Sequence, residues 1–289
     1  MEIDLRSDKH FGKYQSFLFP FAYNITGDVL ASEDIVVEVL NNHVLQDNTE
    51  IQNPKHYLVK SVVNKAINHK QLLRTRKEQY PGFWLPSPVL TAESVYAAAD
   101  KEKVLEYSLL VLMEQLTPKE RAVFILKETF DLSHEEIGQI LDIKTDGSRQ
   151  LLKRSKEKIQ DHNRKSATLD QASKSLMSEL TQAILSADFE KAKSLLVNDV
   201  QFISDGGPAV RASRNMLVGP DPVFKMLQAI YGKYAPEGQT TEFAELNHSP
   251  AILFLLDGKV FRAVVLNIQD GRVANVFTIV NPDKVQKIE

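Results

Sequence analysis

The apolar positions of this chain follow a helical spacing up to about residue 166 and a strand-like alternation in the later part. The segment 14–25 carries Phe17, Leu18, Phe21 and Ala22 on one face. A second helix is predicted over 32–45, with Ser32 as its N-cap. Asn53-Pro54 is expected to start a third helix. The first part of the chain is therefore predicted to be helical.

Two further helix starts carry a specific capping pattern. Thr117-Pro118-Lys119-Glu120 places a capping hydroxyl, a first-turn Pro and a reciprocal carboxylate in order, and Ser133-His134-Glu135-Glu136 repeats the hydroxyl and carboxylate. Thr145 is expected to cap a third helix. Short polar turns separate these helices, so we predict a helix-turn-helix whose last helix enters a DNA major groove.

The last of these helices has two unlike faces. Ser148, Leu151, Leu152, Ser155 and Ile159 share one face, and the other face is cationic and polar. Cations there hold phosphates, and the residues nearest the N-terminal end reach base edges. The candidate DNA-binding residues are Arg149, Gln150, Lys153, Arg154 and Lys156. Taken alone, the same helix also fits an ordinary solvated surface.

A Pro-rich linker follows from Tyr80 to about Ala92, and the chain changes class after Asp170. Helices are predicted over 169–185 and 189–196, a strand over 199–204, and β-runs over 251–256, 260–268 and 272–280. Asp257-Gly258 and Asp270-Gly271 separate these runs and predict type I′ hairpins. The C-terminal part is therefore expected to be an α+β domain.

The net charge of −3 excludes a globally basic protein, but the charges are segregated. No Lys or Arg occurs between Lys13 and Lys55, whereas 55–77 carries cations without a carboxylate. An acidic surface beside a basic one suggests two partners, a protein and a nucleic acid.

The chain has no cysteine, which excludes disulfides and thiolate metal sites. No apolar run approaches the roughly 20 residues that span a bilayer, and the N-terminus lacks the order of a signal peptide. We expect a soluble, cytoplasmic protein that has no membrane partner. The sequence offers no metal-ligand cluster and no Gly-rich phosphate loop, so neither a metal nor a cofactor is expected.

Seven segments, which make up five motifs, carry a family resemblance. Residues 22–36 and Asn53-Pro54-Lys55-His56-Tyr57-Leu58 resemble region 2 of extracytoplasmic-function sigma factors, and Leu116–Phe124 with Ser148–Leu152 resembles region 4. The linker segment Tyr80–Pro88 is similar to that of sigma factors with a SnoaL-like extension. Ile203-Ser204-Asp205-Gly206-Gly207 and Asn281-Pro282-Asp283-Lys284-Val285 resemble two motifs of that extension.

The resemblance implies a multidomain fold. It comprises an all-α region 2 (1–79), a Pro-rich linker (80–100), a helix-turn-helix region 4 (101–165) and an α+β SnoaL-like, cystatin-like cone (168–289). The implied function is transcription initiation. In such a factor the protein binds core RNA polymerase and directs it to the −10 and −35 promoter elements, and it catalyses nothing itself.

The resemblance also implies site residues. Core polymerase would contact Glu33, Asp34, Val37 and Glu38, and the −10 element would contact Lys60, Asn64, Lys65, Asn68, His69 and Arg74. The basic helix described above would read the −35 element. Contacts that tune the sigma domains are assigned to Trp84, Leu85, Pro86, Asp205, Gly206, Gly207, Asn281, Pro282, Asp283 and Lys284.

Departures from the family pattern keep a weakened factor in consideration, one that binds core polymerase but opens promoters poorly. Val37 replaces the usual Gln, and Asn64 and Asn68 replace Arg and Asp. In the C-terminal domain, Pro208 and Ala209 replace Gly and Lys. A one-component regulator that senses a ligand and binds duplex DNA alone is a further alternative.

The cone fold implies a pocket with an apolar mouth, for which we expect the phenylalanines Phe202, Phe224, Phe254, Phe261 and Phe277. A small-molecule ligand of unnamed chemistry is one hypothesis for it. An enzyme is another, with His248 and Asp205 as acid–base candidates. His248 lies in a loop-like stretch and Asp205 in a Gly-rich turn, which disfavours catalysis.

Overall fold

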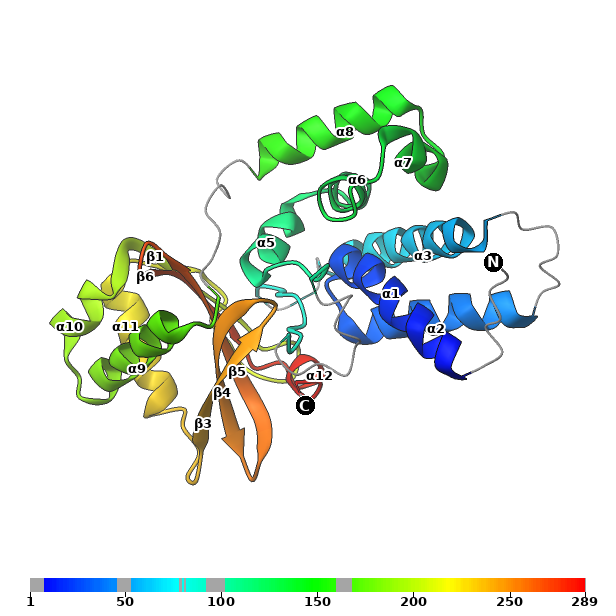
Figure 1. The fold of residues 1–289 in the computed structure, drawn as a ribbon. Coiled ribbons are helices and arrows are strands. Elements are labelled where there is room, and N and C mark those ends of the chain that lie inside the picture. Colours follow the sequence, from blue (N-terminus) through cyan, green and yellow to red (C-terminus); the bar gives the residue numbers. More distant parts are fainter. Residues whose placement is uncertain are drawn as a thin grey trace. The chain divides into compact units, whose positions relative to one another are not determined.

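A computed structural model describes residues 8–45, 53–77, 80, 82–91, 102–159 and 168–288. The chain forms two compact units. The first unit comprises Met1–Glu78, Ser94–Leu105 and Leu112–His162, and the second comprises Gln79–Glu93, Glu106–Val111 and Asn163–Glu289. Figure 1 shows the first unit as helices and the second as a mixed sheet with helices on it.

The first unit begins with three long helices, α1 (Asp8–Thr26), α2 (Val29–Leu45) and α3 (Pro54–Lys77). The predicted start of α3 is confirmed, since the Asn53 side chain accepts the amide of His56 at 3.1 Å. The predicted Ser32 cap is wrong. Helix α2 begins at Val29, because Asp28 accepts the Ala31 amide at 3.2 Å and caps it.

The helix-turn-helix is formed by α6 (Pro118–Glu128), α7 (His134–Leu141) and α8 (Thr145–Lys158), preceded by α5 (Tyr107–Leu112) and a short 3-10 turn, η1 (Met113–Gln115). Both predicted capping boxes are present, at Thr117 and at Ser133. The predicted Thr145 cap is wrong, because Thr145 lies inside α8 and Lys144 precedes it without a side-chain cap.

Within the described residues, the second unit contains a six-stranded sheet, three helices that cover it, a C-terminal helical turn and most of α5. The helices are α9 (Gln171–Leu185), α10 (Phe189–Ser194) and α11 (Pro220–Tyr231), and α12 (Pro282–Val285) is a single turn near the C-terminus. The strands are β1 (Leu196–Asp205), β2 (Leu217–Val218), β3 (Thr240–Leu246), β4 (Ser249–Leu256), β5 (Lys259–Gln269) and β6 (Arg272–Ile279). Their order is β2-β1-β6-β5-β4-β3, and only the β1–β6 pair is parallel within the described residues.

Both predicted hairpins are confirmed. Asp257-Gly258 and Asp270-Gly271 have positive φ at both positions, as a type I′ turn requires. A third hairpin, which we did not predict, joins β3 to β4 through Asn247 and His248, with φ of 50° and 56°. Asn tolerates this conformation better than most residues, which explains why a turn forms without Gly.

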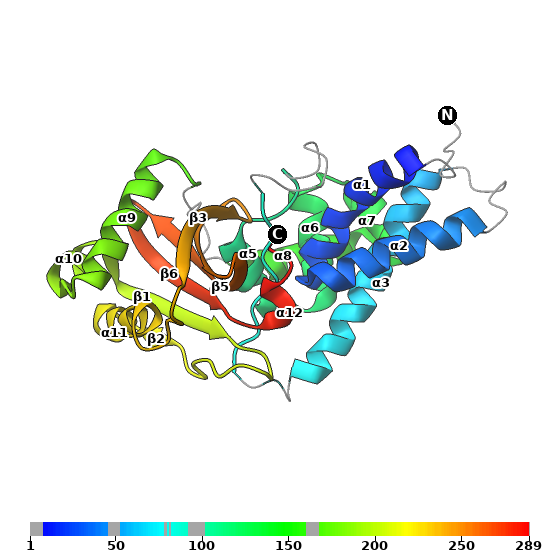
Figure 2. The same cartoon turned by 90° about the horizontal axis from the view of Figure 1, so that it is seen from below.

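The sheet is covered on both faces. Helices α9, α10 and α11 pack on one face, as Figure 2 shows, and bury residues such as Phe202, Phe254 and Val264. The other face packs against Leu85 of the linker, Tyr107 of α5 and the C-terminal residues Val285 and Ile288. Linker residues therefore complete the core of the C-terminal domain. Within the described residues, no helix has the length and apolarity that crossing a membrane requires.

Candidate functional site

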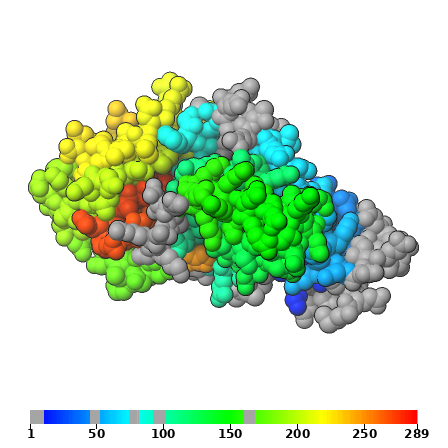
Figure 3. Space-filling model, turned by 90° about the horizontal axis from the view of Figure 1, so that it is seen from above, coloured from blue at the N-terminus to red at the C-terminus, as the bar shows by residue number. Residues whose placement is uncertain are grey.

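Helix α8 presents its predicted DNA-binding residues to solvent. Arg149, Gln150, Lys153, Arg154 and Lys156 are all exposed, and α8 forms part of the visible green surface in Figure 3. Its inward face contains two fully buried serines. Ser155 donates to the Glu120 carbonyl at 3.0 Å, and the Ser148 hydroxyl lies 2.9 Å from Nδ1 of His134. Hydrogen bonds from these serines therefore hold α8 against α6 and α7, at positions where apolar side chains are missing from its inward face.

Two of the predicted DNA-binding cations of α8 form only exposed ion pairs. Arg149 pairs with Asp146 at 2.6 Å and Lys156 with Glu128 at 2.9 Å, and all four side chains are at least one third exposed. Exposed pairs of this kind contribute about 0–1 kcal/mol. A phosphate can therefore replace these carboxylates at little cost.

The predicted core-binding residues share the outer face of α2. Asp34 and Glu38 are exposed, and Glu33 and Val37 are half-buried. Val36 and Leu40 of the same helix are fully buried. Glu38 pairs with Lys65 of α3 at 2.8 Å. This face is acidic and accessible, as a surface for a basic protein partner requires.

The predicted −10 residues on α3 differ in their surroundings. Lys60 donates to the Gln139 carbonyl at 2.9 Å and pairs with Asp142 at 2.8 Å, and Asn64 donates to the Ile140 carbonyl at 2.9 Å. These acceptors lie at the C-terminal end of α7. Asn68 is exposed and His69 is half-buried. The side chain of Arg74 lies outside the described residues.

A buried charge cluster that we did not predict joins α1, α3 and α6. Glu114 accepts from Arg121 at 2.5 Å and from Lys70 at 2.8 Å. Arg121 is fully buried and also donates to the Asn24 carbonyl at 2.7 Å, and Lys70 donates to the Thr26 carbonyl at 2.7 Å. Buried ions are stable only when paired in this way.

Asp205, at the end of β1, is the hub of a second buried cluster that holds the linker. Its carboxylate accepts from the Tyr80 hydroxyl at 2.5 Å, the Leu85 amide at 2.8 Å and the Gly207 amide at 2.9 Å. It also pairs with Lys284 at 2.6 Å. Asp205 is fully buried, so Lys284 is the cation that compensates its charge.

Lys284 connects the C-terminal turn to the linker. Its ammonium donates to the Leu85 carbonyl and lies 4.1 Å from the centre of the Trp84 ring. Asn281 donates to the Tyr80 hydroxyl at 3.1 Å. Burial, followed by the hydrogen bond to Asp205, raises the pKa of Tyr80. The structure therefore brings together Trp84, Leu85, Asp205, Asn281 and Lys284, which the sequence analysis grouped by resemblance.

The two glycines after Asp205 are required by close approach. A Cβ on Gly206 would lie 2.0 Å from the Val210 carbonyl oxygen, and one on Gly207 would lie 2.7 Å from the Asn281 side chain. Pro282 starts α12 and Asp283 is exposed. Gly206 and Gly207 therefore permit close packing of the chain around Asp205.

The linker makes a second contact with the C-terminal domain, which we did not predict from the sequence. The Val89 amide donates to the Asn247 side chain at 2.9 Å, and the Asn247 amide donates to the Val89 carbonyl at 2.8 Å. Thr91 continues the contact by accepting the His248 amide at 3.0 Å. Linker residues 80–91 are thus held at two places on the C-terminal domain. Nothing local in the sequence signals this pairing.

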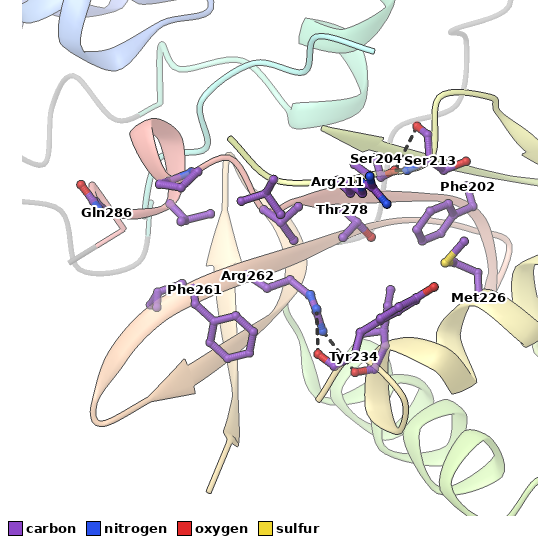
Figure 4. Close-up of a pocket in the computed structure, with 17 residues that line it drawn as sticks. Phe202, Ser204, Arg211, Ser213, Met226, Tyr234, Phe261, Arg262, Thr278 and Gln286 are labelled. Atoms are coloured by element: carbon purple, nitrogen blue, oxygen red, sulfur yellow. Dashed lines mark hydrogen bonds between the residues drawn. The ribbon is translucent and has the colours of Figure 1, made fainter. Parts of the chain in front are cut away.

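The C-terminal domain contains a cavity of about 750 Å³, drawn in Figure 4. Phe202 and Phe261 line it, as predicted. The prediction is wrong for the other three phenylalanines. Phe224 and Phe254 belong to the core under the helices, and Phe277 packs on the opposite face, 5.5 Å from the Tyr107 ring.

Neither predicted acid–base residue lines this cavity. Asp205 is committed to the linker cluster, and His248 lies in the β3–β4 turn with Nδ1 3.7 Å from Glu245. Among the described residues, no group of three or more His, Cys, Asp or Glu side chains is placed to hold a metal ion. The cavity therefore offers a binding surface and no catalytic pair of these residues.

Comparisons with known proteins match one segment to a family model and most of the chain to individual proteins. Residues 107–159 match the family model "Sigma-70, region 4". The ECF RNA polymerase sigma factor SigJ of Mycobacterium tuberculosis is 27% identical over 286 residues, which cover 95% of this chain and 91% of that protein. A probable ECF RNA polymerase sigma factor, SigI of the same species, is 22% identical and covers 95% of this chain and 93% of its own length.

The fold agrees with one solved structure over nearly its full length. The crystal structure of SigJ from M. tuberculosis matches with a TM-score of 0.76 and 24% identity, covering 98% of this chain and 99% of that chain. The predicted architecture is confirmed: a helical N-terminal part is followed by an α+β domain.

Proposed function

We infer that the chain is an extracytoplasmic-function sigma factor of the sigma-70 family with a SnoaL-like C-terminal domain, which confirms the resemblance seen in the sequence. A protein of this family initiates transcription by binding core RNA polymerase and directing it to a promoter. The observation that carries the inference is the exposed basic face of α8 inside the matched region 107–159. The similarity to ECF sigma factors over 95% of the chain agrees with it.

For the −35 element, we propose direct reading by α8 through Arg149, Gln150, Lys153, Arg154 and Lys156. Arg149 and Gln150 lie near the N-terminal end of the helix, where side chains reach base edges in helix-turn-helix complexes. Their exposure and the weak ion pairs of the neighbouring cations support this assignment. The remaining cations would hold phosphates and so position the helix.

For core polymerase, we propose the outer face of α2, formed by Glu33, Asp34, Val37 and Glu38. The accessible carboxylates of Asp34 and Glu38 support an interface with a basic protein surface. The packing of Val36 and Leu40 against the other helices keeps this face rigid. Glu38 of this face also pairs with Lys65 at 2.8 Å, so the proposed polymerase surface adjoins the residues proposed for the −10 element.

For the −10 element, we propose Lys60, Asn64, Lys65, Asn68, His69 and Arg74. Lys60 and Asn64 are bound to the end of α7 in this structure, so these contacts must break before α3 meets DNA. Each contact is solvent-accessible or half-buried, so it is exchanged at low cost for a DNA contact. We therefore propose that the contact between α3 and α7 belongs to a closed arrangement of regions 2 and 4.

For the C-terminal domain, we propose an intramolecular regulatory role without catalysis. The linker between regions 2 and 4 is held on this domain by the Asp205 cluster and by Asn247. The domain therefore limits the length of linker that is free to let the two regions separate. Core polymerase and promoter DNA are the partners we propose, and the cytoplasm is the proposed location.

The test is reconstitution of the full chain with bacterial core RNA polymerase, followed by transcription from a genomic fragment library. We expect a stable complex and transcription from specific promoters. The double substitution Arg149→Ala and Arg154→Ala is expected to abolish promoter-specific transcription while core binding is retained. Lys174→Ala, an exposed cation on α9, serves as the matched control.

Other outcomes identify the alternatives. Failure to bind core polymerase contradicts the sigma assignment, and tight binding to duplex DNA without polymerase would favour a one-component regulator. Core binding without transcription from any fragment would identify a weakened factor. Loss of transcription on Lys174→Ala as well would show that a general charge effect, and not α8, carries promoter recognition.

A further inference from the structure

The cavity of the C-terminal domain contains a buried arginine that has no acidic partner among the residues that the structure describes. Arg262, on β5, is 8% exposed and lines the cavity. It donates to the carbonyl oxygens of Ile230 at 3.1 Å and Tyr234 at 3.3 Å. Among the described residues, no carboxylate lies within 4.0 Å of its guanidinium, and Nε has no hydrogen-bond partner. A buried, uncompensated cation is costly unless an anion joins it.

Aromatic rings flank the guanidinium instead of carboxylates. Its carbon lies 5.3 Å from the centre of the Phe254 ring and 5.2 Å from that of Phe261. Such contacts hold the planar group without neutralising its charge. Burial lowers the pKa of Arg262, against a smaller opposing effect of Tyr231. Arginine nevertheless stays protonated in proteins, so its positive charge remains in the cavity.

A second unsatisfied polar group lines the same cavity. Thr278, on β6, is 3% exposed, and its hydroxyl has no hydrogen-bond partner among the described residues. Thr278 pairs with Val264, which is two positions after Arg262 on β5. Because side chains alternate along a strand, Arg262 and Thr278 lie on the same face of the sheet as diagonal neighbours. The distance between such positions is roughly 7–8 Å, which the long arginine side chain can span.

The remainder of the lining is mostly apolar, and none of the described residues that line the cavity is Asp or Glu. Figure 4 shows Phe202, Met226, Phe261 and Tyr234 around the hollow that also holds Arg262 and Thr278. The volume of about 750 Å³ lies within the range of small-molecule sites. The combination selects a ligand with a sizeable apolar body and one anionic group.

We propose that this cavity binds an organic monocarboxylate, with its carboxylate on Arg262 and Thr278 and its apolar body against Phe202, Met226 and Phe261. Guanidinium and hydroxyl donors match the two oxygens of a carboxylate. Arg211, an exposed residue on the cavity wall, adds positive potential that attracts an anion. This site is distinct from the proposed polymerase and DNA surfaces.

The cavity is connected to the linker through α12. Pro282, Val285 and Gln286 line the cavity, and Lys284 of the same turn holds Asp205 and the Leu85 carbonyl. A ligand that contacts Val285 therefore changes the packing of the turn that fixes the linker. Trp84, the single tryptophan of the chain, lies against Lys284 and reports on this turn.

The test is equilibrium dialysis of the full chain with 2-naphthoate, decanoate and benzoate, beside the uncharged 2-naphthylmethanol. We expect one molecule of 2-naphthoate per chain and at least about tenfold weaker binding of the alcohol, as loss of a charged hydrogen bond predicts. Trp84 emission should change with the same midpoint as binding. The assay measures no transcription, so its result is independent of the sigma function.

Three variants and one control variant test the site. Arg262→Met is expected to weaken 2-naphthoate binding by about tenfold to a hundredfold and to leave the alcohol unchanged. Thr278→Val is expected to weaken it by about tenfold or less. Arg272→Met removes an exposed cation of the same domain and should have no effect. Arg262→Lys retains the positive charge and is less disruptive to the fold. Circular dichroism of every variant separates loss of binding from loss of folding.

Any of three results would overturn the proposal. If none of the three carboxylates binds at millimolar concentration, the cavity is not a carboxylate site. If acid and alcohol bind equally, or if folded Arg262→Met and Arg262→Lys both bind as the native chain does, the cavity recognises apolar bodies only.

Discussion

Substitution of Lys284 by methionine would remove the cation of the linker cluster at nearly constant side-chain volume. Lys284 is 5% exposed, and its partner Asp205 is fully buried at 2.6 Å. After the change, Asp205 keeps its hydrogen bonds from Tyr80, Leu85 and Gly207. Its charge, however, has no compensating cation among the described residues.

The magnitude follows from the burial of the pair. Breaking a buried ion pair by removing one partner costs about 3–5 kcal/mol, because the other charge stays desolvated. The lost hydrogen bond to the Leu85 carbonyl is part of the same effect and is not added to it. A typical domain has roughly 5–15 kcal/mol of stability, so release of the linker is expected before the whole domain unfolds.

Urea unfolding followed by two spectroscopic signals measures the release of the linker separately from the unfolding of the domain. Trp84 emission reports on the linker, because Trp84 is the single tryptophan and lies on Lys284. Far-ultraviolet circular dichroism reports on the helices and the sheet. We expect Lys284→Met to lower the Trp84 midpoint more than the dichroism midpoint, so that the two transitions separate.

Lys287→Met is the matched control, because Lys287 is exposed and only three positions away in sequence. It is expected to change stability by less than about 0.5 kcal/mol. If Lys284→Met behaved like Lys287→Met, with both signals moving together by such a small amount, the argument that Lys284 compensates Asp205 would be refuted.

Three further predictions concern the helical unit. Gly138→Ala places a Cβ 2.8 Å from the Ile143 carbonyl oxygen and should destabilise the helix-turn-helix by about 1–3 kcal/mol. Gly147→Ala has no neighbour closer than 4.0 Å and should stabilise it by up to about 1 kcal/mol. Urea midpoints of the two variants that shift in the same direction would contradict this prediction. Burial raises the pKa of Glu120, but hydrogen bonds from Lys158 and Thr117 outweigh it and lower the pKa overall. Its stabilising contribution is therefore present above the unfolded pKa of about 4.3 and is lost as pH falls through the lower folded pKa, so midpoints from pH 7 to 2 should decline more steeply than in Glu120→Gln. Asp142→Asn frees Lys60 from an exposed pair at 2.8 Å and should change stability by less than about 1 kcal/mol while increasing promoter-dependent transcription; unchanged transcription would argue against the closed arrangement.

Local elements were predictable because their interactions are local. The capping boxes at Thr117 and Ser133 join residues three positions apart, and the Asp-Gly hairpins need only positive φ at two successive residues. The errors at Ser32 and Thr145 have a matching cause. Several polar residues near a helix start can act as its cap, and packing selects one of them, as Asp28 shows for α2.

The resemblance grouped Asp205, Asn281 and Lys284 with the linker, but only the folded chain decides how they pair. Asp205 is 79 residues from Lys284 and 120 from Leu85. A charged residue looks the same in sequence whether it is exposed or buried, and burial is what makes its partner important. Composition and periodicity establish the helical and α+β parts, because these patterns depend on neighbouring residues in the sequence. Only the tertiary structure places Arg262 in an apolar cavity where no described carboxylate pairs with it, because strands from distant segments form the walls of that cavity.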